Sequence, residues 1–364
     1  MIPLFDYRPQ YAELRGEIES AMRRVLESGR VILGPEVAAF EREFAAWVGA
    51  AGAVGVASGT DALTLALRAV GVGPGHEVIT VANAGAPPVA AIRNAGAMPR
   101  FADVDPGGLV IDPASVEPLV TDRTRAVVAV HLYGGAAPLA ELAELVRRHG
   151  LVLIEDCAQG HGTRHGSSPV GTFGSVGCFS FYPTKNLGAY GDGGACVSDD
   201  PEILERLRRL REYGFVNDRS SHVEGTNSRL DELQAAVLRI KLSHIERALD
   251  ARQAVAHRYL AALAGHDLVL PALPAAGRHA FHLFVVRAQD RARRIASLER
   301  HRIGYGIHYP TPVHVMPAYG FLGQDQGTLP ETERACRTVL SLPLYPGLDD
   351  ASVDRVVDAL TSRV

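Results

Sequence analysis

The sequence predicts an α/β protein whose sheet is mostly parallel and is covered by helices on both faces. Short, almost wholly apolar segments at 78–81, 126–132 and 151–155 are typical of strands that are buried on both sides. Segments with helical periodicity separate these strands, which is the rhythm of parallel β–α–β units. Ligands of such sheets gather at the carboxyl ends of the strands, so we expect the site there.

The composition is typical of a globular protein with one large and one smaller domain. Of 364 residues, 47% are hydrophobic and 21% are charged, and the formal net charge is −4. This balance lacks the basic excess that nucleic-acid binding requires. The four scattered cysteines favour neither a zinc site nor disulfides, and neither a signal-peptide pattern nor a membrane-spanning apolar run occurs. We therefore expect a cytoplasmic protein without membrane or nucleic-acid partners.

The order of the predicted elements divides the chain. Helices are expected at 11–29, 35–48, 62–70, 88–95, 113–119, 139–149 and 201–213, and strands at 54–57, 78–81, 100–104, 126–132, 151–155 and 195–197. A long helix from Leu230 to about Tyr259 follows, and then a strand at 281–286, a helix at 291–301, a strand at 307–309 and a helix at 349–362. We expect a large domain over residues 1–250, which begins with a helical segment, and a smaller C-terminal α/β domain over residues 251–364.

Ser58-Gly59-Thr60-Asp61 joins the strand at 54–57 to a strongly apolar helix. Ser58 is a good helix N-cap, and Gly59 lets the backbone approach a ligand closely. A strand, a turn of small residues and a helix N-terminus together make an anion site, because free N–H groups and the helix dipole point at the ligand. The alternative for this short signal is a plain capped helix.

The chain contains only two lysines, Lys185 and Lys241, so any chemistry that needs a lysine amine must use one of them. Lys241 lies in a segment of helical periodicity, which predicts a solvated helix side chain. Lys185 lies between a proline and a glycine, just after an apolar-aromatic run that predicts a strand. Catalytic groups concentrate at such strand ends, although an ordinary surface lysine is the alternative.

The strand at 151–155 ends in two carboxylates, Glu155 and Asp156. Neighbouring side chains alternate across a strand, so only one of the two can face the site. A buried carboxylate needs a cation or hydrogen-bond donors, but a strand-end Asp can also simply cap the next turn. His161 and His165 have the spacing of helical metal ligands, but the glycines around them argue against a helix, so we predict no metal site.

These features, in this order, suit pyridoxal 5′-phosphate. This cofactor requires a lysine for its Schiff base, a carboxylate against its pyridine nitrogen and donors for its phosphate. The sequence resembles the DegT–DnrJ–StrS family of sugar aminotransferases, which are fold-type I pyridoxal-phosphate enzymes. The segments that carry the resemblance are 58–63, 131–134, 154–159, 180–188 with 191–194, 227–234 and 307–310.

The resemblance implies roles for individual residues. Lys185 would form the internal aldimine and shuttle the proton, and Asp156 would keep the pyridine nitrogen protonated. Gln159 is similar to the residue that contacts the ring hydroxyl of the cofactor. The residues implied for the phosphate are Gly59, Thr60 and Ser180, with Asn227 from a second subunit of a homodimer. The residues implied for the sugar pocket are Tyr182, Arg229, His308 and Tyr309, with packing aromatics at a domain seam as the alternative.

One departure from the family pattern bears on both the cofactor and the substrate. Many relatives stack an aromatic residue on the cofactor from an Asn-Thr-Phe stretch, whereas this chain has Asn83-Ala84-Gly85 and no aromatic between Val81 and Arg100. Such a start resembles the subgroup that acts on 3-keto nucleotide sugars. We predict an aminotransferase that moves an amino group from glutamate, or alternatively glutamine, to a 3-keto dTDP-deoxysugar. The alternatives are a 4-keto sugar, a keto-cyclitol, or a non-catalytic regulator that binds pyridoxal phosphate.

Overall fold

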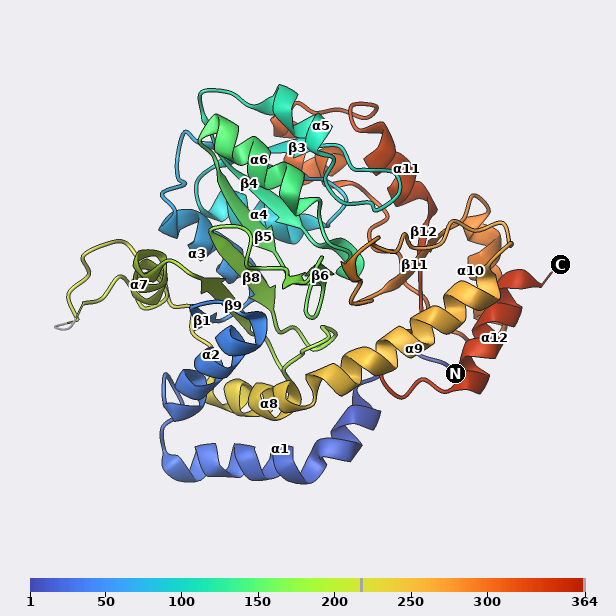
Figure 1. Cartoon of the computed structure of the whole chain (residues 1–364), viewed down its shortest axis with the longest axis horizontal. Helices are drawn as coiled ribbons and strands as arrows, with labels where there is room; N and C mark the ends of the chain where they lie inside the picture. The colour runs from blue at the N-terminus through green and yellow to red at the C-terminus, as the bar shows by residue number, and fades with distance from the viewer. Residues whose placement is uncertain (217–218, 363–364) are drawn as a thin grey trace.

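The computed structural model describes residues 1–216 and 219–362, and it confirms the predicted α/β class (Figure 1). Seven strands form the central sheet in the order β1-β9-β8-β5-β4-β2-β3. Only β9 runs antiparallel to its neighbours β1 and β8, so the sheet is mostly parallel. Its strands are β1 (Gly52–Val56), β2 (Glu77–Val81), β3 (Met98–Ala102), β4 (Thr124–Val130), β5 (Val152–Asp156), β8 (Val176–Ser180) and β9 (Gly194–Ser198).

Helices cover both faces of this sheet because its strands are apolar on both sides. Along β4, Val127 and Ala129 belong to one apolar cluster, and Ala126 and Val128 belong to the other. The first cluster includes residues of α2, α6 and α8, and the second includes residues of α3, α4 and α7. The bounds of the large-sheet helices are α1 (Arg8–Ser28), α2 (Pro35–Val48), α3 (Gly59–Ala69), α4 (Ala86–Asn94), α5 (Pro113–Val116), α6 (Leu139–His149), α7 (Pro201–Leu210) and α8 (Glu232–Ser243).

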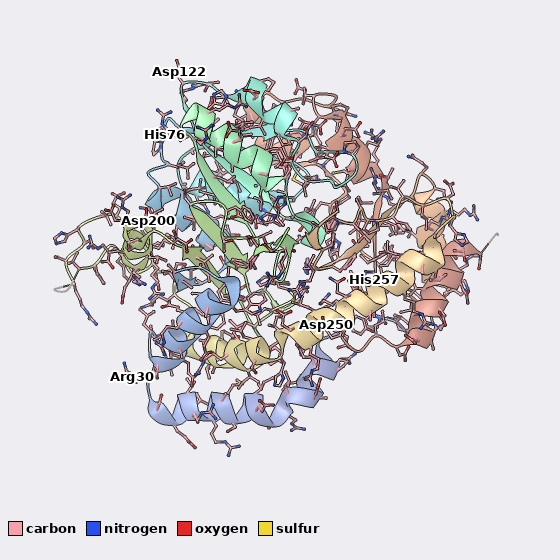
Figure 2. All side chains as sticks on the ribbon, viewed as in Figure 1. Arg30, His76, Asp122, Asp200, Asp250 and His257 are labelled. Atoms are coloured by element: carbon pink, nitrogen blue, oxygen red, sulfur yellow. The ribbon has the colours of Figure 1, made fainter. Side chains whose placement is uncertain are left out.

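The C-terminal part has its own apolar cluster around a two-stranded antiparallel sheet. Its elements are α9 (Ile245–Leu263), β11 (Phe284–Arg287), α10 (Arg291–Arg300), α11 (Pro330–Thr338), β12 (Val339–Leu342) and α12 (Asp350–Thr361), and the short strands β6 (Arg164–His165), β7 (Ser168–Pro169) and β10 (Gly277–Arg278) form a third sheet. Asp250, where the sequence predicts the domain boundary, lies on α9 (Figure 2). The division at that residue stays a prediction.

Two predicted elements are wrong. The long helix from Leu230 to Tyr259 is two helices, because His244 leaves helical geometry at φ −111° and ψ 8°, so that α8 ends and α9 begins there. The strand predicted at 307–309 does not form. Instead, the His308 carbonyl accepts a hydrogen bond from the Tyr133 hydroxyl, and only Gly306 pairs with Ser341 of β12. No helix in the described part of the chain has the length and apolar content needed to cross a bilayer.

Candidate active site

A cavity of about 260 Å³ lies beyond the carboxyl ends of β5 and β8. The residues that line it are Leu4, Phe5, Gln159, Tyr182, Thr184, Lys185, His282, Leu283, His308, Tyr309 and Leu344. Gln159 follows β5, and Tyr182 and Lys185 follow β8, whereas His308 and Tyr309 come from the C-terminal part. The position agrees with the expectation that ligands of a parallel sheet bind at its carboxyl edge.

Lys185 is presented by a closed loop that follows β8. The Lys185 N–H donates to the Tyr182 carbonyl at 2.9 Å, and the Ala189 N–H returns to the Phe181 carbonyl at 2.7 Å. A Cβ at Gly188 would stand 2.5 Å from the Pro183 carbonyl oxygen, so this turn admits only glycine. Burial lowers the pKa of Lys185 to about 8, against the opposing effect of the Asp156 charge. An amine with this pKa can exchange a proton near neutral pH.

Asp156 ends β5 and is 5% exposed. Its Oδ1 accepts a hydrogen bond from the Ala158 N–H at 3.0 Å. Burial raises the pKa of Asp156, while that hydrogen bond and the positive charge of Lys185 act to lower it. The carboxylate and the amine therefore favour each other's charged form across the site.

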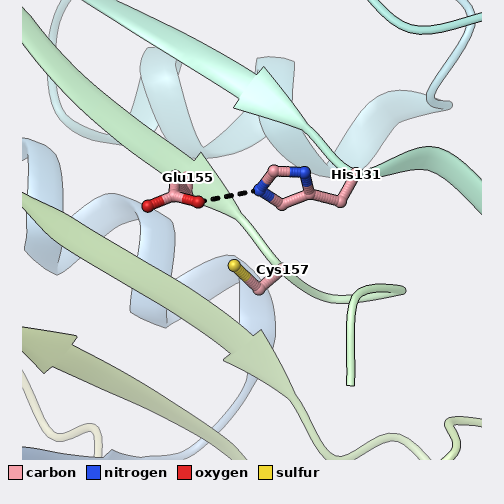
Figure 3. Close-up of side chains that lie close together, drawn as sticks. All are labelled: His131, Glu155 and Cys157. Carbon is pink, nitrogen blue, oxygen red and sulfur yellow. Dashed lines mark hydrogen bonds and ion pairs between the residues drawn. The ribbon is translucent and has the colours of Figure 1, made fainter. Parts of the chain in front are cut away.

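Glu155 serves the opposite side of the strand. Burial acts to raise the pKa of Glu155, but hydrogen bonds from His131 Nε2 and from the N–H groups of Gly171 and Gly174 leave it lowered. His131 Nδ1 accepts the Ala137 N–H, which assigns the remaining ring proton to Nε2 (Figure 3). Cys157 lies close enough to complete a metal-ligand cluster with His131 and Glu155. Glu155 is instead saturated with donors, which suits a structural anchor.

The start of α3 forms a cradle next to the cavity. The Ser58 Oγ caps the helix by accepting the Asp61 N–H at 3.1 Å, so the N–H groups of Gly59 and Thr60 have no intrahelical acceptor. A Cβ at Gly59 would stand 2.6 Å from Ser180 Cβ, so the glycine allows Ser180 and the helix terminus to meet. The predicted anion-binding residues Gly59, Thr60 and Ser180 are thus brought together.

Gln159 connects the end of β5 to the aromatic wall of the cavity. Its Oε1 accepts the Tyr133 N–H at 2.6 Å, which turns its amide nitrogen towards the other side. Burial raises the pKa of Tyr309, as does the charge of Asp156, and a hydrogen bond from Gln159 acts in the opposite direction. Tyr309 therefore lies near both Asp156, which ends β5, and Gln159, which follows it.

Asn227 and Arg229 do not line the cavity of their own chain. Asn227 is exposed at the base of the loop that follows α7, and this loop projects away from the body of the molecule (Figure 1). Between them, the Ser228 Oγ donates to Asp61 Oδ2 at 2.7 Å and accepts the Ala57 N–H at 3.1 Å. The base of the loop is therefore tied to the rear of the cradle.

The prediction of a solvated Lys241 is wrong. Lys241 is 3% exposed, because both α1 and α2 pack on α8. Its ammonium donates to the Gly188 carbonyl and lies 5.1 Å from the ring centroid of Tyr190. Burial lowers its pKa to about 8, as does the charge of Arg252.

Two buried histidines lie near Lys185: His161, which the sequence suggested only as a metal ligand, and His282, which no sequence pattern singled out. His161 packs against the rings of Phe179 and Phe181, and burial lowers its pKa to about 3. His282 lines the cavity, and burial with the nearby charge of Lys185 holds its pKa well below its ordinary value. His282 lies in a segment that was assigned to a strand, and only the fold brings it to the cavity.

A mostly parallel sheet with a lysine and a carboxylate at its carboxyl edge defines a class, the fold-type I aminotransferases. Comparison with known proteins supports that class. The DegT/DnrJ/EryC1/StrS aminotransferase family matches residues 12–361, and the chain belongs to this family. The predicted family and the predicted enzyme class, a transaminase, are confirmed.

Relatives with assigned activities cover the whole chain. The dTDP-3-amino-3,4,6-trideoxy-alpha-D-glucose transaminase of Streptomyces venezuelae is 46% identical over 360 residues, which are 99% of this chain and 95% of that protein. The crystal structure of S. venezuelae DesV in complex with a ketimine intermediate has a TM-score of 0.97, with coverage of 100% and 99%. The structure of ntda from Bacillus subtilis with bound cofactor PMP is 30% identical, has a TM-score of 0.89 and covers 96% of this chain and 81% of that one.

Proposed function

We propose that this aminotransferase uses pyridoxal 5′-phosphate to move an amino group from L-glutamate to the 3-keto group of a dTDP-linked deoxysugar. The observation that carries the proposal is the pair of Lys185 and Asp156 at one site, which has an anion cradle beside it. The 46% identity to a dTDP-3-amino-sugar transaminase along the whole chain supports the choice of sugar and carbon.

The residues of the site fit pyridoxal phosphate. The bare Cα of Gly59 and the free N–H groups of the α3 terminus suit a phosphate. Asp156 offers a buried carboxylate to the pyridine nitrogen, and Gln159 offers an amide to the ring hydroxyl. When bound, the cofactor would supply an electron-accepting ring next to the substrate nitrogen.

Two side chains of the protein, Lys185 and Asp156, would then have different roles in the reaction. Lys185 Nζ, with a pKa of about 8, would take up and return the substrate proton near neutral pH. Asp156 would hold the proton on the ring nitrogen, and its burial strengthens that interaction because little water screens it.

The substrate would enter past the aromatic residues of the cavity. Tyr182, which is 52% exposed, lies at the open side, while His308 and Tyr309 form the wall of the C-terminal part. Asn227 and Arg229 would reach the site of a partner subunit from the projecting loop, which makes the protein a homodimer with shared active sites. The fact that neither residue lines its own cavity supports this arrangement.

A non-catalytic regulator is the second candidate, because one relative, 42% identical over 362 residues, is the pleiotropic regulatory protein of Geobacillus stearothermophilus. The distinguishing measurement is the near-ultraviolet and visible spectrum of the cofactor-loaded protein before and after glutamate is added. An enzyme should convert its bound cofactor to the amino form, whereas a regulator should leave the spectrum unchanged.

The identity of the sugar can be tested directly. A panel of 3-keto and 4-keto dTDP-sugars and keto-cyclitols, with glutamate or glutamine as donor, should give an aminated product by mass spectrometry only with the true partners. We expect the 3-keto dTDP-sugar with glutamate to react fastest. Faster amination of a 4-keto sugar or a cyclitol would overturn the proposed substrate and leave the aminotransferase class intact.

A further inference from the structure

The turn that follows β2 approaches the ring of Tyr309 closely. Gly85 is buried, has a φ of 76° and precedes α4. A Cβ at this position would stand 3.1 Å from both Cε1 and Cζ of Tyr309. Any side chain at residue 85 would therefore push the tyrosine ring, in addition to straining the backbone. The sequence separation of Gly85 and Tyr309 hides this contact from any local pattern.

Tyr309 also faces the groups that surround the expected position of the cofactor ring. It lines the same cavity as Lys185, the charge of Asp156 acts to raise its pKa, and its hydroxyl interacts with the Gln159 side chain. These three residues would meet three different points of a pyridine ring. The tyrosine ring thus lies between Gly85 and the groups that would surround the cofactor.

The segment that carries Tyr309 is held in place from two sides. The Tyr133 hydroxyl donates to the His308 carbonyl, and His308 Nδ1 lies 2.8 Å from Ser341 Oγ. The backbone of Gly306 exchanges hydrogen bonds with Ser341 at 3.1 and 2.8 Å. A ring that is fixed in this way loses little conformational entropy when it contacts a ligand.

We propose that Tyr309 is a cofactor-contacting residue whose ring covers the ring of pyridoxal phosphate on the side of Gly85, and that Gly85 lacks a side chain in order to admit it. This inference rests on the proposed function, because it presumes that pyridoxal phosphate occupies the cavity. Tyr309 would then take the place of the aromatic residue that this chain lacks between Val81 and Arg100. Aromatic rings attract each other beyond the effect of buried area, so the contact should strengthen cofactor binding.

The test is a titration of the apo-protein with pyridoxal 5′-phosphate, followed by absorbance. We expect Tyr309→Ala to raise the dissociation constant about tenfold, and Tyr309→Phe, which keeps the ring, to stay within about threefold of wild type. Tyr305→Ala is the matched control, because Tyr305 lies on the same segment but outside the cavity lining, and its hydroxyl donates to Glu299 instead. It should leave cofactor affinity unchanged. Circular dichroism and thermal unfolding of each apo-protein would verify folding.

Gly85→Ala gives a second test in which Tyr309 itself is retained. Alone, it should weaken cofactor binding by displacing the tyrosine ring. In the double variant with Tyr309→Ala, it should cost much less, because the displaced ring is gone. Additive effects would overturn the proposed role of Gly85.

The results separate this inference from the proposed function. If the wild type binds no pyridoxal phosphate, the proposed function itself fails, and this inference fails with it. If the wild type binds the cofactor and Tyr309→Ala binds it equally tightly, with a raised KM for the sugar as its only defect, Tyr309 belongs to the sugar pocket alone. The proposed function would then stand.

Discussion

Lys185 and Lys241 have similarly lowered pKa values but differ in their access to the cavity and in the groups around them. Burial lowers the pKa of each to about 8. Lys185 lines a cavity and has the charge of Asp156 near it, whereas Lys241 is 3% exposed and gives its ammonium to a backbone carbonyl. A perturbed pKa therefore does not identify a catalytic lysine by itself. Access to a cavity and a carboxylate on its opposite side make the distinction.

The second lysine supports the first. Lys241 holds the Gly188 carbonyl, and Gln234 on the same helix accepts the Tyr190 N–H at 2.9 Å. Both contacts lie just after Lys185 in the chain, so α8 supports the loop that carries Lys185. One lysine is expected to do the chemistry and the other to hold the loop in shape.

The largest expected effect is the loss of activity in Lys185→Ala. The variant removes the amine that faces the cavity, so transamination should fall below detection while the protein stays folded and can still hold the cofactor non-covalently. The assay is product formation by mass spectrometry, with the yellow colour of the wild-type holoprotein as a second readout. Wild-type activity in Lys185→Ala would mean that Lys241 provides the amine and that the roles assigned to the two lysines are exchanged.

Substitutions of the neighbouring carboxylates Asp156 and Glu155 should have clearly different effects, one on turnover and the other on stability. Asp156→Asn keeps the shape but removes the negative charge that would keep the ring nitrogen protonated, so we expect turnover to fall by roughly a thousandfold or more, as for wrong-state substitutions at other catalytic acids. Glu155→Gln instead removes an acceptor of several buried N–H groups. It should lower the free energy of unfolding by about 1–3 kcal/mol. Near-wild-type turnover of Asp156→Asn would assign the role to Glu155.

Much of the fold could be predicted from local patterns, because strands that are buried on both faces must be apolar throughout. The prediction that Lys185 is the functional lysine came from the count of two lysines, the predicted strand end before Lys185 and the family resemblance. The burial of Lys241 could not be predicted, because helical periodicity does not reveal that α1 and α2 both cover α8. The same packing buries Glu232, which accepts the N–H groups of Gly34 and Val37.

The site shows the same division between local and tertiary information. Ser58 and Gly59 carry their signal in four consecutive residues, and the helix begins there as predicted. His282 and the contact between Gly85 and Tyr309 depend on how the C-terminal part meets the large sheet. No spacing in the sequence encodes those contacts, so only the folded structure makes them visible.

An intermediate effect is expected when two inactive variants are mixed. One carries Lys185→Ala, and the other carries Asn227→Ala together with Arg229→Ala. If the projecting loop completes the partner's site, a mixed dimer has one site with no defect and one site with both. Activity should then return to about half of the wild-type value per mixed dimer once subunit exchange is verified, for example by native mass spectrometry. If exchange occurs between folded, dimeric variants without a return of activity, Asn227 and Arg229 serve their own subunit.

The smallest expected effect is in the pH dependence of the free energy of unfolding, which distinguishes the two lysines. A lysine whose pKa is about 8 in the folded state releases its proton before the unfolded chain does, so the unfolded state binds more protons between about pH 8 and 10.5. The free energy of unfolding of the wild type should therefore rise with pH in this range relative to Lys241→Met, by up to about 3 kcal/mol. Lys241→Arg stays charged throughout and should show no such rise, which makes it the control. In urea unfolding of the apo-protein, the free energy of unfolding of the wild type should also rise with pH relative to Lys185→Met, because burial lowers the pKa of Lys185 as well. When cofactor is bound, the difference between wild type and Lys185→Met should change, because that amine is then engaged, whereas the Lys241 difference should persist. If the cofactor alters the Lys241 difference instead, Lys241 rather than Lys185 meets the cofactor.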